Sequence, residues 1–292
     1  MVSSDNELAF IGLGGMGAGM ALRLREAGFP LVVHNRTAAK AVPLAGAGAR
    51  VAASSAEAAG AARIVVLSLS DQTAVERVLF GELSGRLRPG ALVVDTSTVS
   101  PAYSADAAER LAGIGVRRLE ACVLGNPAMA HAGRLRVFTA GRAEDADEAR
   151  DVLEALAQEV THVGPAGSAC AMKLAFNLIL GNQIAALAEA LLLADSAGLD
   201  RDLLLTAVAG SGLSSPTLAF RAELMRTRRY EPAAFRSALM EKDLRLAVGE
   251  AAARGLELPV TAGVAARFAE VVLAGDGDRD AAVVAEPRSP VG

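Results

Sequence analysis

The sequence predicts an α/β fold for its first part and an all-helical fold for the rest. Residues 7 to about 165 alternate short apolar runs with alanine-rich stretches of helical character. Such alternation is typical of a parallel sheet with helices on both faces. After Gly167 no convincing strand pattern follows, and residues 167–198 read as one long apolar helix. We therefore predict two domains, 1–166 and 167–292.

Seven apolar runs are the strand candidates. In chain order they are LAFIGL, LVVHN, RIVVLSLS, ALVVDTST, RRLEACV, LRVFTAG and VTHVG. In the second part, the helical pattern is broken at AGLD, GSGLSSP, YEP and RGLELP, where Gly and Pro favour turns. These breaks predict several further helices after the long one.

Length and composition indicate a globular protein with a substantial core. The chain has 292 residues, of which 52% are apolar. Its 29 basic and 33 acidic residues give a formal net charge of -4, without long runs of one sign. A nucleic-acid surface and a basic membrane patch are therefore not indicated, whereas small-molecule ligands remain open.

The cysteines and histidines form no metal or disulfide pattern. Cys122 and Cys170 give no disulfide framework, and the three scattered histidines provide no ligand cluster. The N-terminus lacks the basic and apolar regions of a secretory signal. We therefore expect a metal-free protein of the reducing cytoplasm.

The segment FIGLGGMGAGM carries a glycine pattern between a predicted strand and a predicted helix. Its glycines stand in G-x-G-x-x-G register, in which the first permits a tight turn and the second lets the backbone approach a pyrophosphate. The third allows close packing of helix on strand, and the helix N-terminus faces the anion. The alternative is a glycine-rich turn without a ligand. The predicted cofactor contacts are Gly12, Leu13, Gly14, Gly15, Met16 and Gly17.

The end of the second strand favours NADP over NAD. An NAD site places an acid there for the ribose 2′-hydroxyl, but the chain has HNRT at residues 34–37. Arg36 can bind a 2′-phosphate bidentately, while Asn35 and Thr37 supply hydrogen bonds. The alternative for Arg36 is a solvated surface side chain.

Lys173 is unusual within the long apolar helix. Only three of the 29 basic residues are lysine, and Arg cannot release a proton near neutral pH whereas a desolvated Lys can. Lys173 and Asn177 stand at i and i+4, so one ligand can touch both. The alternative is a lysine whose ammonium reaches water. The polar residues of this helix argue against a membrane span.

Six ordered segments carry a resemblance to a known family. They are GLGGMGAGM, HNRT, DTSTVSP, GSACAMKLAFN, EKDLRLA and GLELPV…AGDGDRDAAVV. In order and spacing they resemble the β-hydroxyacid dehydrogenases, which include 3-hydroxyisobutyrate dehydrogenases and NADPH-dependent glyoxylate and succinic semialdehyde reductases. The resemblance implies a Rossmann-type N-terminal domain, a long interdomain helix and a helical C-terminal domain. Because the 167–198 helix is apolar almost all round, as expected for packing between domains and against a partner subunit, we predict a homodimer, with a tetramer as the alternative.

The resemblance also implies roles for individual residues. It makes Lys173 the general acid/base of hydride transfer between NADPH and a carbonyl compound, with Asn177 holding the substrate. It places Ser97 and Thr98 beside nicotinamide and substrate, and Lys242 near cofactor or substrate. We further predict cofactor contacts for Leu69 and Ser70, at the end of the third strand candidate.

One segment departs from the family's D-A-P-V-S-G-G pattern, whose Ser and Gly grip the substrate carboxylate. The chain has EACVLGN, so Leu124, Gly125 and Asn126 replace Ser-Gly-Gly and Cys122 replaces Pro. Leu124 indicates either simple repacking or a less polar substrate, and the amide of Asn126 can restore one donor. Two alternatives stay open: an imine reductase, although such relatives typically lack the catalytic lysine, and a non-catalytic NADP-binding protein.

Overall fold

The structure, a computed structural model, describes residues 7–60, 62–83 and 85–286. The chain forms two compact units, Met1–Lys173 and Leu174–Gly292. The long helix that begins at Ser168 therefore contributes its first residues, up to Lys173, to the first unit.

The first unit is built on one eight-stranded sheet in the order β3-β2-β1-β4-β5-β6-β7-β8. The strands are β1 Leu8–Ile11, β2 Leu31–His34, β3 Arg50–Val51, β4 Ile64–Leu67, β5 Leu92–Asp95, β6 Arg117–Leu124, β7 Leu135–Ala140 and β8 Ala157–His162. All seven predicted runs contribute a strand, which confirms the α/β prediction. The additional strand, β3, has only two residues, both exposed, and so leaves no apolar run in the sequence.

The prediction of a parallel sheet is wrong at one pair of strands. In the order of the sheet, all strands from β3 through β2, β1, β4 and β5 to β6 are parallel. Strand β7 runs antiparallel to β6, and β8 is parallel to β7. Only residues 125–134 join β6 to β7. A parallel crossover needs a dozen or more residues, so this connection returns the chain in the opposite direction.

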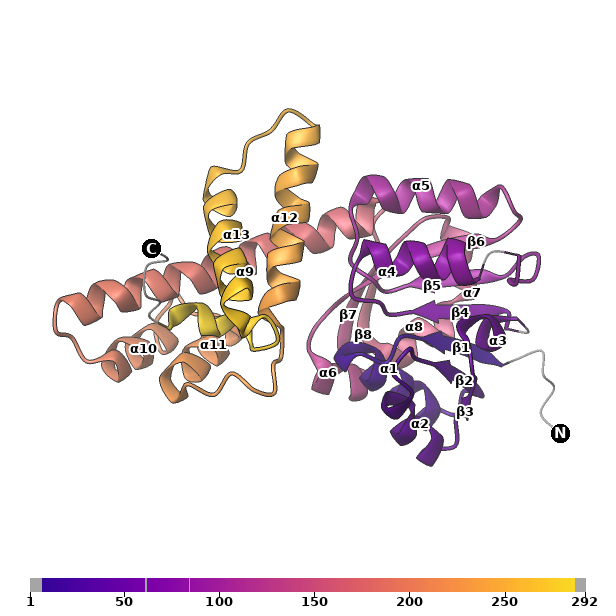
Figure 1. Cartoon of the computed structure of the whole chain (residues 1–292), viewed down its shortest axis with the longest axis horizontal. Helices are drawn as coiled ribbons and strands as arrows, with labels where there is room; N and C mark the ends of the chain where they lie inside the picture. Colours follow the sequence, from indigo (N-terminus) through magenta and orange to yellow (C-terminus); the bar gives the residue numbers. More distant parts are fainter. Residues whose placement is uncertain (1–6, 61, 84, 287–292) are drawn as a thin grey trace. The chain divides into compact units, whose positions relative to one another are not determined.

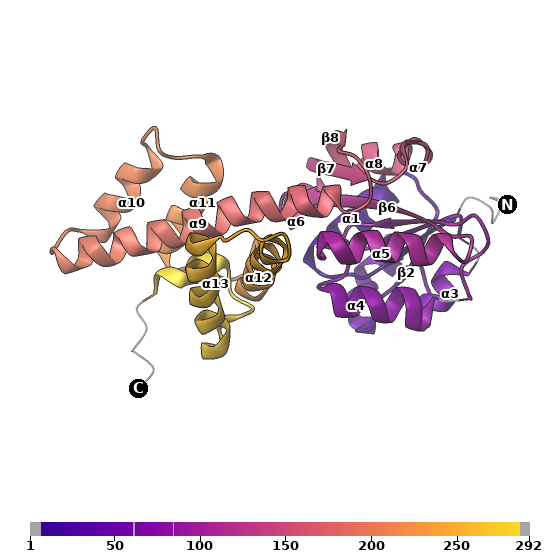
Figure 2. The same cartoon turned by 90° about the horizontal axis from the view of Figure 1, so that it is seen from above.

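Helices cover both faces of the sheet, as Figures 1 and 2 show. They are α1 Gly15–Glu26, α2 Val42–Gly46, α3 Ser55–Ala59, α4 Gln72–Glu76, α5 Pro101–Ala112, α6 Pro127–His131, α7 Ala143–Glu148 and α8 Arg150–Leu156. Alternate strand residues enter different cores: Phe10 packs with α1 and α8, whereas Ile11 packs with α3 and α5. This period of two is what a sheet buried on both faces requires.

In the second unit, the secondary structure of the described residues is helical apart from an isolated bridge between Arg236 and Asp280. It comprises α9 Ser168–Ser196 from Leu174 onward, α10 Arg201–Ala209, α11 Pro216–Thr227, α12 Ser237–Ala253 and α13 Pro259–Val271, followed by a short 3-10 turn, Ala281–Ala285. The helices end at the predicted breaks. Their apolar side chains share one core, in which Leu187 of α9, Met240 of α12 and Phe268 of α13 are buried.

Helix α9 is apolar enough to cross a membrane by length and composition alone, with a mean hydropathy of 1.5 in its most apolar window. Core helices pass the same test. Its buried positions, which include Leu174, Asn177, Ile184 and Leu191, recur every three or four residues. This spacing gives α9 one buried stripe that packs into the helical core.

Candidate active site

The glycine-rich turn connects β1 to α1 and has two positions at which only glycine fits. Gly12 has a φ of +99°, and a Cβ atom there would lie 2.3 Å from the carbonyl oxygen of Ser68. A Cβ atom on Gly17 would lie 2.0 Å from the carbonyl oxygen of Gly12. At Gly14 an added Cβ would meet no atom within 4 Å. The turn is therefore tight on its protein side and open at Gly14.

The N-terminus of α1 is left without a side-chain cap. Gly14 occupies the N-cap position, and no side chain accepts a hydrogen bond there. Among the other helices of the first unit, α3, α4, α5 and α6 are capped by the side chain of the preceding residue, whereas α2, α7 and α8 are not. The first amide groups of a helix need acceptors and carry a partial positive charge. The α1 terminus therefore suits an anion, as a dinucleotide pyrophosphate provides.

Asn35 ties the end of β2 to this turn. Its Oδ1 accepts a hydrogen bond from the Leu13 backbone amide at 2.8 Å, and its Nδ2 donates to the Thr37 carbonyl oxygen at 3.0 Å. Leu13 itself is buried in the core, so only its backbone faces the turn. Arg36 and Thr37 are exposed beside Asn35. The structure thus brings the glycine-rich turn and HNRT together, with Asn35 occupied in joining them.

The ends of β4 and β5 lie together as well. The Ser97 hydroxyl accepts a hydrogen bond from the Leu69 amide at 2.9 Å, and the Ser97 amide donates to Asp95 Oδ1 at 2.9 Å. Ser97 is buried, whereas Thr98 is half-buried and Ser70 is exposed. Parallel strands present their carboxyl ends at one edge of a sheet, where α/β proteins bind ligands. All the predicted cofactor residues of the first unit follow β1, β2, β4 or β5 at this edge.

A polar cluster is buried in the second unit. The Asn177 amide on α9 donates to Asp243 Oδ2 on α12 at 2.5 Å. The ammonium of Lys242 lies 2.9 Å from Asp243 Oδ1. Asn177, Lys242 and Asp243 are only 3%, 9% and 2% exposed, so their contacts with one another offset part of the cost of burying polar groups. The predicted residues Asn177 and Lys242 are thereby linked through Asp243.

Lys173 lies on α9 one helical turn before Asn177, and its side chain is half-buried. The first turn of α9 also carries Cys170, whose sulfur lies 3.7 Å from that of Cys122 on β6. The hydrogen bond with Cys170 and burial raise the pKa of the Cys122 thiol well above its ordinary value. Both thiols are free and buried.

Family models match both parts of the chain. Residues 7–164 match the NAD-binding domain of 6-phosphogluconate dehydrogenase. Residues 167–287 match the NAD-binding domain of NADP-dependent 3-hydroxyisobutyrate dehydrogenase. The chain belongs to the β-hydroxyacid dehydrogenase family. It is an oxidoreductase with an NAD(P)-binding domain.

Individual members of this family resemble the whole chain. Glyoxylate/succinic semialdehyde reductase 1 of Arabidopsis thaliana is 32% identical, over 96% of this chain and 97% of the relative. The solved 3-hydroxyisobutyrate dehydrogenase of Mycobacterium tuberculosis, with L-serine, is 30% identical at a TM-score of 0.85, covering 96% and 98% of the two chains. An imine reductase of Streptomyces aurantiacus is 26% identical at a TM-score of 0.63, covering 95% and 98%.

The turn after β6 contains the segment that differs from the pattern expected from the family resemblance. Gly125 has a φ of +145°, and an added Cβ would lie 2.6 Å from Leu135. Asn126 Oδ1 accepts a hydrogen bond from the Met129 amide at 2.9 Å and so caps α6. Leu124, the last residue of β6, is half-buried. The side-chain oxygen of Asn126 therefore stabilises the N-terminus of α6.

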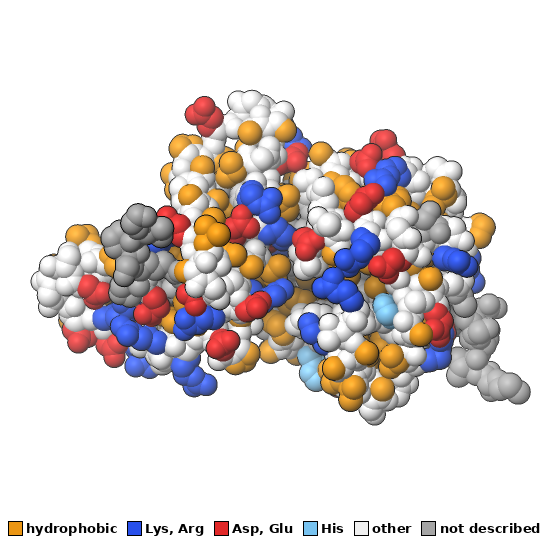
Figure 3. Space-filling model, in the orientation of Figure 1, with side chains coloured by type: hydrophobic (Ala, Val, Ile, Leu, Met, Phe, Trp, Pro, Cys, Tyr) orange, Lys and Arg blue, Asp and Glu red, His pale blue; other side chains and the backbone are white. Residues whose placement is uncertain are grey.

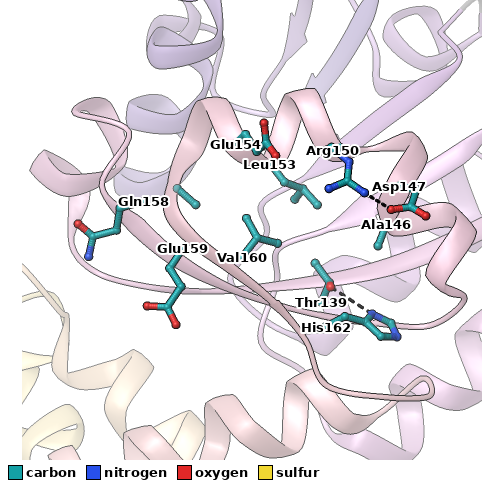
Figure 4. Close-up of a pocket in the computed structure, with 11 residues that line it drawn as sticks. Thr139, Ala146, Asp147, Arg150, Leu153, Glu154, Gln158, Glu159, Val160 and His162 are labelled. Atoms are coloured by element: carbon teal, nitrogen blue, oxygen red, sulfur yellow. Dashed lines mark hydrogen bonds and ion pairs between the residues drawn. The ribbon is translucent and has the colours of Figure 1, made fainter.

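A surface hollow of about 450 Å³ lies elsewhere on the first unit. Figure 4 shows it beside β7, α7, α8 and β8, with Arg150 paired to Asp147 and His162 hydrogen-bonded to Thr139. None of the predicted site residues lines it. Within the described ranges, no group of three His, Cys, Asp or Glu side chains is arranged to hold a metal ion.

Sequence reasoning missed a second set of buried polar residues in the first unit. Asp95, Ser104, Arg118 and Glu120 are each at most 5% exposed and contact one another. The signal was present in RRLEACV, because two charged residues alternate with apolar ones in a strand predicted to be covered on both faces. Buried charges in such a strand call for partners.

Proposed function

We propose that the chain is an NADPH-dependent reductase of a small carbonyl compound and, in reverse, a dehydrogenase of the corresponding hydroxy compound. The observation that carries this proposal is the buried cluster of Asn177, Asp243 and Lys242, with Lys173 one helical turn before Asn177. Polar groups that fix one another in a buried setting are preorganised to act on a ligand.

The proposed chemistry assigns one task to each of these residues. NADPH, when bound, supplies the hydride to the carbonyl carbon. As that carbon accepts the hydride, the carbonyl oxygen gains negative charge, and Lys173 donates a proton to it as general acid. Asn177 orients the substrate, because Asp243 holds its amide in one position. In the reverse direction, neutral Lys173 accepts the proton of the hydroxyl group.

The residues of the first unit fit a dinucleotide with a 2′-phosphate. Gly14 has open space, and α1 has no side-chain cap, so its first amides would hold the pyrophosphate. Exposed Arg36 would bind the 2′-phosphate, since residues 34–37 contain no acid to select an NAD ribose. Leu69, Ser97 and Thr98 would lie beside the nicotinamide.

The substrate class is proposed from the relatives and from the turn after β6. The relatives' names include reductases of glyoxylate and succinic semialdehyde and a 3-hydroxyisobutyrate dehydrogenase. Leu124 offers no hydroxyl to a carboxylate, and Asn126 already caps α6. We therefore place the substrate among small aldehydes and ketones whose far end is less polar than a carboxylate.

A substrate panel with and without Lys173 tests the proposal. The wild-type enzyme and Lys173→Ala are compared on aldehydes, ketones and cyclic imines, with NADPH and NADH in parallel. We expect aldehyde-dependent oxidation of NADPH to fall about a hundredfold or more in Lys173→Ala, while NADPH affinity by fluorescence titration stays unchanged. Undiminished aldehyde turnover in Lys173→Ala would refute Lys173 as the proton donor.

The same panel separates two further candidates. Imine reduction is favoured by Leu124 in place of the anchor serine and by the likeness to an imine reductase. It predicts turnover of a cyclic imine that survives Lys173→Ala. A non-catalytic NADP-binding protein predicts cofactor binding without turnover of any compound.

We further propose that the enzyme is a homodimer of the cytoplasm that binds neither nucleic acid nor membrane. Met172, Ile179, Ala186 and Leu193 are exposed on α9 at intervals of seven residues, which forms an apolar stripe suited to another helix. On the face drawn in Figure 3, acidic and basic side chains are interspersed. Sedimentation equilibrium of the purified protein tests the assembly, and a monomer at micromolar concentration would contradict it.

A further inference from the structure

Strand β6 carries two buried charges on a single face of the sheet. Arg118 and Glu120 stand two residues apart, so their side chains share the face that also carries Cys122. The alternate residues Leu119 and Ala121 enter the apolar core on the other face. The side chains of Arg118 and Glu120 are each 1% exposed.

Glu120 binds the first turn of α9. Its Oε1 accepts a hydrogen bond from the Gly167 amide, and its Oε2 accepts from the amides of Ala169 and Cys170, each at 3.1 Å. These amides carry the positive end of a 29-residue helix, so a carboxylate there is favourable. Lys173 follows Cys170 by three residues. Glu120 therefore fixes the helical turn that leads directly into Lys173.

Arg118 and Ser104 connect Glu120 to the turn after β5. The Ser104 hydroxyl donates to Glu120 Oε1 at 2.7 Å and accepts from Arg118 Nη1 at 2.7 Å. Arg118 Nη2 donates to Asp95 Oδ2 at 2.8 Å. The other oxygen of Asp95 accepts the Ser97 amide at 2.9 Å. One chain of contacts thus runs from the segment of Ser97 and Thr98 to the start of α9.

The buried ion pairs of Arg118 with Asp95 and Glu120 are not explained by stability alone. Replacing a buried ion pair by apolar side chains of similar volume is often neutral or stabilising. The network instead fixes the relative positions of the segments that it joins, because each hydrogen bond requires a particular distance and angle. Its two ends are segments to which the proposed function assigns nicotinamide contact and proton transfer.

We propose that Glu120, Ser104 and Arg118 are positioning residues for the reaction. They hold the backbone of Lys173 at a fixed distance from Ser97 and Thr98. This inference rests on the proposed role of Lys173 as general acid. Misplacing a catalytic group by about 1 Å costs up to a hundredfold in rate, so loosening the network should lower kcat and spare cofactor binding.

Ser104→Ala is the decisive variant because it removes one hydroxyl and keeps every charge. Ser55→Ala is the matched control, since Ser55 is also buried in the first unit and also donates to a carboxylate, that of Glu82. We expect both variants to lower Tm by about 2–4 °C. We expect only Ser104→Ala to lower kcat, by about tenfold, on the fastest aldehyde of the panel, with the KM for NADPH within about twofold of wild type.

A double-mutant cycle with Lys173→Ala completes the test. If the network acts through Lys173, Ser104→Ala changes the residual turnover of Lys173→Ala by less than about twofold. A tenfold loss in that background too, or a wild-type kcat in Ser104→Ala, would overturn the inference. Undiminished activity in Lys173→Ala alone would instead overturn the proposed function, and with it this inference. Glu120→Gln, if it folds, is a second test variant, and we expect it to lower kcat more than Ser104→Ala does.

Discussion

The turn after β1 and the turn after β6 begin alike and end differently. Each contains a glycine of positive φ, Gly12 at +99° and Gly125 at +145°, and each leads into a helix. Before α1 stands Gly14, with open space around it and no side-chain cap. Before α6 stands Asn126, whose side chain accepts the hydrogen bond of the helix's own amide. The first amides of α1 have no side-chain acceptor and are available to a ligand. In α6, the Met129 amide donates to a side chain of the protein itself.

This difference separates the turn that matches the expected family pattern, after β1, from the turn that differs from it, after β6. The turn after β1, which we call the open turn, has space at Gly14 and uncapped helix amides, both of which suit a pyrophosphate. The turn after β6, which we call the closed turn, lies where the family resemblance implies binding of the substrate carboxylate. Leu124 and Asn126 stand there in place of serine and glycine. Under the proposed function, the turn after β1 holds the cofactor, whereas the turn after β6 gives a substrate carboxylate little to bind.

Closing the open turn should have the largest effect. In Gly14→Asp, the new carboxylate would cap α1 and repel the pyrophosphate. The backbone of Gly14, at φ -68° and ψ -175°, accepts any L-residue. We expect NADPH affinity, measured by fluorescence titration, to fall on the order of a hundredfold or more, while Tm stays equal or rises.

Gly14→Ala is the matched control for that variant. It adds a methyl group in open space without charge or capping oxygen. We expect a smaller loss of affinity than in Gly14→Asp and an unchanged fold. Wild-type NADPH affinity in Gly14→Asp would show that the α1 terminus does not bind the cofactor.

Arg36→Ala should have the next largest effect, and it tests which cofactor the open turn takes. Charge-assisted hydrogen bonds are worth about 1.5–3 kcal/mol, so NADPH affinity should fall about ten- to a hundredfold while NADH affinity changes little. Arg36→Lys keeps the charge without the bidentate geometry and should lie between. Equal losses for NADPH and NADH, measured by the same titration, would argue against a 2′-phosphate contact.

Much of the fold was predictable because its signals are local. Apolar runs mark the seven longer strands, Gly and Pro mark the helix ends, and the glycine register marks the turn before α1. The direction of β7 was not predictable from its residues, since an apolar run looks the same in either direction. The two-residue strand β3 was missed because its exposed residues pair with β2 through the backbone alone.

The side-chain clusters were harder to predict than the motifs that contain them. Asn177 and Asp243 are 66 residues apart, and only the packing of α9 with α12 makes them partners. We predict that Asn35 touches the cofactor, but the hydrogen bonds by which its amide group joins Leu13 to Thr37 could not be predicted from the motif. A motif indicates which residue types lie near a ligand. Which contact each of these residues makes depends on packing between distant parts of the chain.

Asn126→Ala should have the smallest effect, and it tests the closed turn. Loss of an N-cap costs about 1 kcal/mol, which corresponds to a fall of about 2–4 °C in Tm, measured by calorimetry, with NADPH affinity unchanged. Asn126→Asp keeps a capping oxygen and should retain the Tm of the wild type. Because Asn126→Asp removes the amide nitrogen, a raised KM for the carbonyl substrate in that variant would reveal a substrate contact. If Asn126→Ala keeps its Tm and raises this KM, the turn after β6 is a binding turn like the one after β1, and the contrast between them fails.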